Sequence, residues 1–116
     1  MQYLLLIYAN EAEAAGKSQA DMAAMMTEYG AFTQSIIKSG NFKAGDALQQ
    51  TSAATTVRLR GGKTLTTDGP FAETREQLGG YYLIEAKNLD EAIAVAARVP
   101  SAKFGSIEVR PVMKYD

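Results

Sequence analysis

Two short segments of this chain are apolar on both of their alternating faces. The first runs from Tyr3 to Tyr8 and the second from Tyr81 to Ile84. A strand that water contacts on one side alternates between apolar and polar residues, whereas a strand covered on both sides is apolar throughout. The chain is therefore expected to form a sheet with two covered faces, and each face needs helices, further strands or a second molecule against it.

Two amphipathic helices are predicted between the strands. Ser18 followed by Asp21 is a helix-capping pattern, and Gly40 is a typical residue just past a helix end. Apolar residues three or four positions apart define the buried face of this first helix: Met22, Met25, Met26, Tyr29, Phe32, Ile36 and Ile37. The methionines are interpreted as core packing rather than as a thioether metal site. A second helix is predicted to begin after Asn88 and to stop at Pro100.

The predicted elements follow the order strand–helix–strand, hairpin, strand–helix–strand. The outer strands are a weakly alternating segment at 41–50 and a last strand at 106–112. A length of 116 residues is typical of one domain. The sequence thus predicts a single α+β domain over residues 1–116 with a ferredoxin-like, split βαβ sheet and both helices on one face.

Helices on one face leave the other face of the sheet without cover. Residues 55–60 alternate with Val57 and Leu59 inward, the Arg60-Gly61-Gly62-Lys63 segment predicts a turn, and 64–67 forms the return strand. This hairpin could fold over the open face within one chain. We favour a second copy of the chain, packed sheet against sheet as a two-fold dimer.

The composition removes several kinds of chemistry. The chain has no His, Cys or Trp, which rules out a Ser-His-Asp or Cys-His catalytic group, a zinc site built on Cys or His, and a disulfide. Acid–base catalysis would have to use carboxylates, Tyr, Lys, Arg or a terminus. A net charge of −1 does not indicate nucleic-acid or membrane binding, and no apolar run fits a signal peptide or a membrane span. We expect a cytoplasmic protein without a cofactor or a metal.

The segment from Asp68 to Gly80 has the features of a binding site. Its Asp-Gly-Pro start predicts a rigid turn that presents Phe71 in a defined direction. Charged residues follow that turn, and two tyrosines come directly after the segment. The candidate ligand-binding residues are Asp68, Phe71, Glu73, Arg75, Tyr81 and Tyr82. Residue chemistry alone favours a structural turn with a solvated, charged loop over a ligand pocket.

The stretch from Asp68 to Glu85 also resembles the signature of the YCII-related, or DGPF-domain, family of small bacterial proteins. Similarity to the family extends to residues 3–8, 45–48 and 105–112, so it covers essentially the whole chain. The resemblance implies a dimeric α+β barrel, in which two ferredoxin-like subunits join through their sheets and leave a cleft in or beside the barrel.

The family resemblance says less about chemistry. Members are often encoded near extracytoplasmic-function sigma factors, which implies a stress or regulatory setting or a protein partner, and some relatives are lyase- or dehalogenase-like enzymes with a His–Asp pair. The His of that pair has no counterpart in residues 18–26 of the first helix, and Val99 stands where Asp usually precedes Pro100. Phe104 stands at a separate position, where DGPF-domain members commonly have His. We therefore expect a small-ligand-binding homodimer. The alternative is a lyase- or isomerase-type enzyme acting on a small ring compound through Asp or Glu, Arg75 and Tyr.

Overall fold

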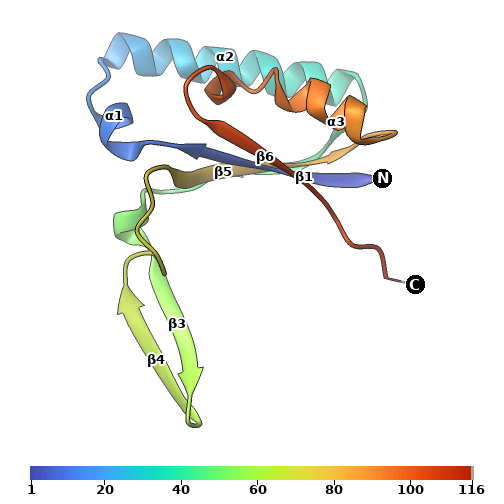
Figure 1. Cartoon of the computed structure of the whole chain (residues 1–116). Coiled ribbons are helices and arrows are strands. Elements are labelled where there is room, and N and C mark those ends of the chain that lie inside the picture. The colour runs from blue at the N-terminus through green and yellow to red at the C-terminus, as the bar shows by residue number, and fades with distance from the viewer. Residues whose placement is uncertain (116) are drawn as a thin grey trace.

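A computed structural model describes residues 1–115. In chain order the elements are β1 (Gln2–Ala9), α1 (Glu11–Ala15), α2 (Gln19–Lys38), β2 (Phe42–Ala47), η1 (Thr51–Ala53), β3 (Thr55–Arg60), β4 (Lys63–Asp68), β5 (Gln77–Glu85), α3 (Leu89–Ala96), η2 (Pro100–Lys103) and β6 (Ser106–Pro111), where η marks a short 3-10 helix. Figure 1 shows the helices above a sheet and a long hairpin below it.

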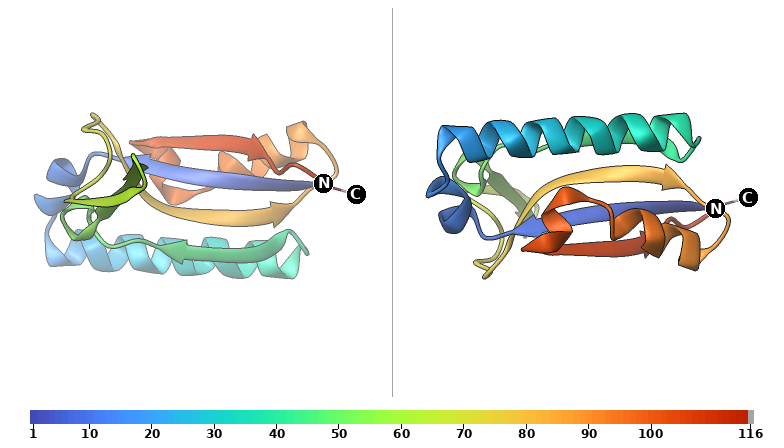
Figure 2. Two further views of the ribbon diagram at one scale, coloured as in Figure 1. Left: turned by 90° about the horizontal axis from the view of Figure 1, so that it is seen from below. Right: turned by 90° about the horizontal axis from the view of Figure 1, so that it is seen from above.

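The main sheet has four strands in the order β2-β5-β1-β6, and all neighbouring strands are antiparallel. β1 and β2 therefore run parallel with β5 between them, and β5 and β6 run parallel with β1 between them. Seen from above, α2 and α3 lie side by side across one face of this sheet (Figure 2). This arrangement confirms the predicted ferredoxin-like α+β fold.

The core lies between the two helices and the sheet. Tyr3, Leu5 and Ile84 from the central strands are buried there against Ile36 of α2 and Val99 after α3. The local signals that predicted the helices are present in the structure. The Ser18 side chain accepts a hydrogen bond from the Asp21 backbone N–H, and Asn88 caps α3 in the same way. Gly40 has a φ of 84°, as expected for a residue just past a helix end.

The prediction of the buried face of the first helix was wrong in part. Met22, Met26 and Ile37 do not pack in the core, since their side chains are 56%, 76% and 47% exposed. The buried part of α2 is its second half, and the apolar spacing shows which face of the helix is apolar without showing how much of that face has a partner. The segment after β1, for which the sequence pattern predicts no element, begins with the five-residue helix α1, capped by Asn10. A helix this short carries no periodic pattern.

The β3–β4 hairpin stands away from the main sheet as a separate two-stranded sheet (Figure 1). Its turn residues Gly61 and Gly62 have φ of 58° and 75°, which confirms the predicted tight turn. Val57 and Leu59 were expected to face inward, but within this chain they are 62% and 66% exposed. The hairpin does not fold over the open face of the sheet, so that alternative is excluded.

The open face remains without cover from residues 1–115. Leu4, Leu6 and Leu83 on that face are only partly buried. The chain exposes 8260 Å², whereas a compact monomer of 12.5 kDa is expected to expose roughly 6,200 Å². Its radius of gyration is 16.2 Å, against about 13 Å for a compact domain of this length. The chain thus exposes about 2,000 Å² more than a compact domain of its mass.

Candidate functional site

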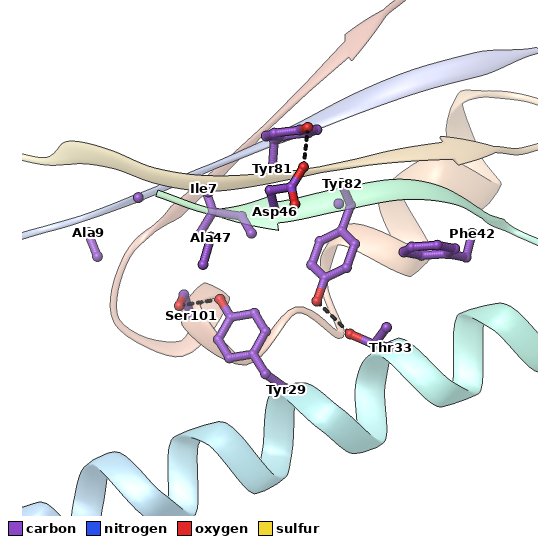
Figure 3. Close-up of a pocket in the computed structure, with 13 residues that line it drawn as sticks. Ile7, Ala9, Tyr29, Thr33, Phe42, Asp46, Ala47, Tyr81, Tyr82 and Ser101 are labelled. Carbon is purple, nitrogen blue, oxygen red and sulfur yellow. Dashed lines mark hydrogen bonds between the residues drawn. The ribbon is translucent and has the colours of Figure 1, made fainter. Parts of the chain in front are cut away.

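A cavity of about 350 Å³ lies between α2 and the sheet (Figure 3). Thirteen residues line it, from β1, α2, β2, the start of β5 and η2. None of them is a lysine or an arginine, and the surface is mainly aliphatic and aromatic. A volume of this size is within the range of small-molecule sites.

Small residues on the facing strands leave room for the cavity. Ala9, Gly45, Ala47 and Gly80 all line it. A Cβ at Gly45 would lie 2.6 Å from Cδ1 of Tyr82, so only glycine lets the Tyr82 ring lie against β2. The ring of Tyr82 lies between two other aromatic side chains that it meets edge to face, those of Phe32 and Phe42, with centroid distances of 5.2 and 6.3 Å.

Two hydroxyl pairs face the cavity. The Tyr82 and Thr33 hydroxyl oxygens are 2.6 Å apart, and those of Tyr29 and Ser101 are 2.5 Å apart. Each pair has two O–H protons and uses one of them between its members, so the pair has a second proton that it can donate. Burial raises the pKa of the Tyr29 hydroxyl, which keeps that group neutral and able to donate at physiological pH.

Tyr81 points to the opposite side of the sheet from Tyr82, because successive residues of a strand alternate. Figure 3 shows Tyr81 and Asp46 together on the side away from Tyr29. The Tyr81 hydroxyl donates to Oδ2 of Asp46 at 2.6 Å, and this hydrogen bond raises the pKa of Tyr81. Asp46 and Tyr81 thus connect the cavity wall with the open face.

The structure separates the sequence-predicted site residues into two groups. Tyr81 and Tyr82 are both among the cavity residues, and of the two hydroxyls only that of Tyr82 lies on the side of α2. Asp68 ends β4, and Phe71, Glu73 and Arg75 follow it in the exposed loop that leads to β5; Phe71 is 79% exposed. These four are not among the cavity residues, so their contact with a ligand stays a prediction.

Sequence reasoning missed four polar members of the cavity: Tyr29, Thr33, Asp46 and Ser101. Tyr29 was assigned to the core from its spacing. The signal available was its hydroxyl, since a buried Tyr usually finds a partner for this group. Ser101 had no comparable signal, because it reaches Tyr29 only through the tertiary fold.

Val99, at the position of the Asp of the His–Asp pair, and Phe104, at a separate position where DGPF-domain members commonly have His, have other roles here. Val99 is 1% exposed and belongs to the core. The ring of Phe104 has the Lys17 ammonium 3.9 Å from its centroid, a cation–π contact at the surface. Within residues 1–115, no group of three or more acidic side chains is placed to hold a metal ion, and no helix is long and apolar enough to cross a membrane.

The fold and the cavity define a ferredoxin-like α+β protein with an apolar, hydroxyl-lined pocket between helix and sheet. The family model of the YCII-related domain matches residues 1–116. A protein of Rhizobium meliloti (strain 1021), described only as uncharacterised, is 38% identical over 117 residues, which is 99% of this chain and 94% of the relative. The chain belongs to the YCII-related family, which confirms the resemblance found in the sequence.

Proposed function

We propose that this protein binds a small, uncharged molecule with a carbonyl-type oxygen in the cavity beneath α2, and that it does so as a homodimer. The observation that carries the proposal is the pair of hydroxyl clusters, Tyr29–Ser101 and Tyr82–Thr33, in an otherwise apolar cavity. Each cluster has a proton to donate. An acceptor oxygen on an apolar ring matches both features of the wall. A link to sigma-factor regulation stays a prediction from the family resemblance.

The lack of a cation at the cavity selects against anions. A carboxylate moved from water into an apolar cavity needs a cation or several donors to offset its lost hydration. No lysine or arginine is among the residues that line the cavity. We therefore expect neutral ketones, lactones or quinone-like rings to bind better than acids of the same size.

Three probes of similar size test this ligand class: acetophenone has an acceptor oxygen, toluene has none, and benzoate is an anion. Only a ligand that binds the native state raises the melting temperature, and a concentration of ten times Kd adds about 1.4 kcal/mol. Acetophenone should raise Tm by several degrees, toluene less, and benzoate not at all. Equal stabilisation by benzoate and acetophenone would contradict the proposal.

Variants of the two tyrosines test the location. Tyr29→Phe and Tyr82→Phe each remove one hydroxyl and should weaken acetophenone binding about three- to tenfold, as expected for one lost hydrogen bond. Toluene binding should change little. Tyr115→Phe is the matched control, because Tyr115 is exposed and remote from the cavity residues. An unchanged acetophenone Kd in both cavity variants would place the ligand elsewhere.

The homodimer is supported by the apolar open face. Leu6 lies at its centre on β1, between Tyr81 of β5 and Glu108 of β6. The area exposed in excess, about 2,000 Å², is larger than the roughly 800 Å² that each partner buries in a standard interface. Leu6→Asp should yield a monomer in sedimentation equilibrium, whereas Gln34→Asp on the exposed side of α2 should leave the dimer intact. A wild-type monomer at micromolar concentration would refute this assembly.

The lyase- or isomerase-type alternative has less support. It needs a carboxylate inside an enclosed pocket, where burial would bring its pKa toward neutrality. Asp68 and Glu73 lie in exposed segments, and Asp46 is also exposed and accepts a hydrogen bond on the open side. Ligand binding explains the cavity without requiring such a base.

A further inference from the structure

We infer that the β3–β4 hairpin, residues 55–68, is an arm that packs against a second copy of this chain through the face that carries Val57 and Leu59. This inference rests on the homodimer proposed above and assigns a second part to its interface. A two-stranded hairpin alone is at best marginally stable in water. Val57 and Leu59 are nevertheless more than half exposed in the subunit, so their cover has to come from outside it.

The two faces of the arm differ in chemistry. In the strand register Val57 lies opposite Thr66, and Leu59 lies opposite Thr64. Side chains directly opposite each other share a face, so this face is uncharged from its middle to the tip. The other face of the arm carries three cations, Arg58, Arg60 and Lys63, together with one apolar residue, Leu65, which lies opposite Arg58. The uncharged face fits an apolar protein surface, and the basic face fits solvent.

Hydrogen bonds join the two strands at the base of the arm and attach the segment before the arm to α1. The backbone N–H and the hydroxyl of Thr51 both donate to the Glu11 carboxylate, each at 2.8 Å. The Gly69 N–H donates to the Ala54 carbonyl at 2.7 Å, and the Thr56 hydroxyl donates to the Gly69 carbonyl at 2.8 Å. An arm held in this way is pre-organised, which lowers the entropy lost when it binds a partner.

The direction and length of the arm bring it to the partner. Figure 1 shows that it leaves the domain on the open side of the sheet, so that sheet and arm form an L. Stacked sheets are about 10 Å apart, and strands of six residues extend about 20 Å. A partner sheet stacked on the open face would lie beside the arm. An arm of that length extends past this partner sheet. Two-fold symmetry places the partner's arm against the first subunit in the same way.

Substitutions on the two faces of the same strand test the inference. Val57→Ser with Leu59→Ser removes the apolar face, and Arg58→Ser with Arg60→Ser is the matched control on the basic face. Sedimentation equilibrium should show the dimer Kd raised at least a hundredfold by the first pair and changed less than threefold by the second. Because all four side chains are exposed in the subunit, circular dichroism should show both variants folded. An unchanged Kd for the Val57/Leu59 variant would overturn the inference.

The experiments distinguish a wrong homodimer proposal from a wrong assignment of the arm. If the wild type is monomeric, both fail. If Leu6→Asp dissociates the dimer while Val57→Ser with Leu59→Ser does not, only the arm fails.

A second measurement uses the absence of cysteine in the chain. Leu59→Cys and Arg60→Cys would each carry a single photoactivatable maleimide label. A cross-link between subunits is expected from Leu59→Cys and not from Arg60→Cys. Equal yields from the two positions would contradict the assigned face.

Discussion

A methyl group added at Gly45 tests how the cavity is built. Gly45 of β2 is paired with Tyr82 of β5, and a Cβ there would lie 2.6 Å from Cδ1 of the ring and 3.1 Å from the Tyr81 carbonyl oxygen. The ring cannot move aside freely, because Phe32 and Phe42 flank it and its hydroxyl is hydrogen bonded. Gly45→Ala should therefore force the ring or β2 to shift.

The expected loss of stability is that of an overpacked core, about 1–3 kcal/mol. For a domain of this size each kcal/mol lowers Tm by about 4 °C. Gly30→Ala is a control of opposite sign: Gly30 lies within α2, a Cβ there would meet nothing within 4 Å, and Ala in a helix is favoured over Gly by about 1 kcal/mol. Urea unfolding of the two variants measures both effects.

The clash depends on the ring, so a double-mutant cycle isolates it. In a Tyr82→Leu background, Gly45→Ala should cost much less, with a coupling of about 0.5–3 kcal/mol between the two sites. Gly45→Ala should also weaken acetophenone binding, since it displaces a hydroxyl that lines the cavity. A Gly45→Ala protein as stable as wild type, or one equally destabilised in both backgrounds, would refute this account of the cavity.

Three further predictions concern charges and caps. The Lys87 backbone N–H donates to the Glu91 carboxylate and holds the pKa of Glu91 below its ordinary value of 4.5. The stability that this hydrogen bond adds is present above pH 4.5 and is lost as the pH falls through the lower folded-state pKa. The stability of Glu91→Gln should therefore be less sensitive to acid in unfolding measurements. The hydrogen bond to Asp46 raises the pKa of Tyr81 above 10.0. Its contribution to stability is present below pH 10 and is lost as the pH rises through the higher folded-state pKa. Asp46→Asn should lower the pKa of Tyr81 in absorbance titrations at alkaline pH. Asn88→Ala removes the cap of α3 and should cost about 1 kcal/mol in urea unfolding.

The parts of the fold that could be predicted are those set by neighbours in sequence. Helix caps at Ser18 and Asn88 and the glycine turn at 61–62 depend on a few adjacent residues. Strand order followed from the succession of elements, because few topologies join two strand–helix–strand units in one small sheet. The caps and the turn are determined before distant parts of the chain meet, and topology rules then limit how the distant strands can pair.

The candidate site was predictable only in part, because a cavity is a property of packing between distant segments. Gly69 of the Asp-Gly-Pro segment has a φ of 97°, a conformation that favours glycine. A local turn, however, does not show where the loop will lie. Tyr29 meets Ser101 across 72 positions of the chain, and alternation in β5 could assign Tyr81 and Tyr82 to opposite faces without showing which face holds the cavity.

The two-sided apolar pattern of β1 and β5 is only half satisfied by one chain. On the helix side these strands are buried, but Leu4, Leu6 and Leu83 on the open side are partly exposed. Polar groups on that side lie toward the edges of the sheet: Asp46 on β2, and Glu108 with Arg110, an ion pair on β6. An apolar centre with a polar rim is the arrangement of a protein–protein interface. Single-chain burial does not explain such a pattern, since water would contact its apolar half, whereas a second sheet against this face would give each strand the two covers that its sequence indicates.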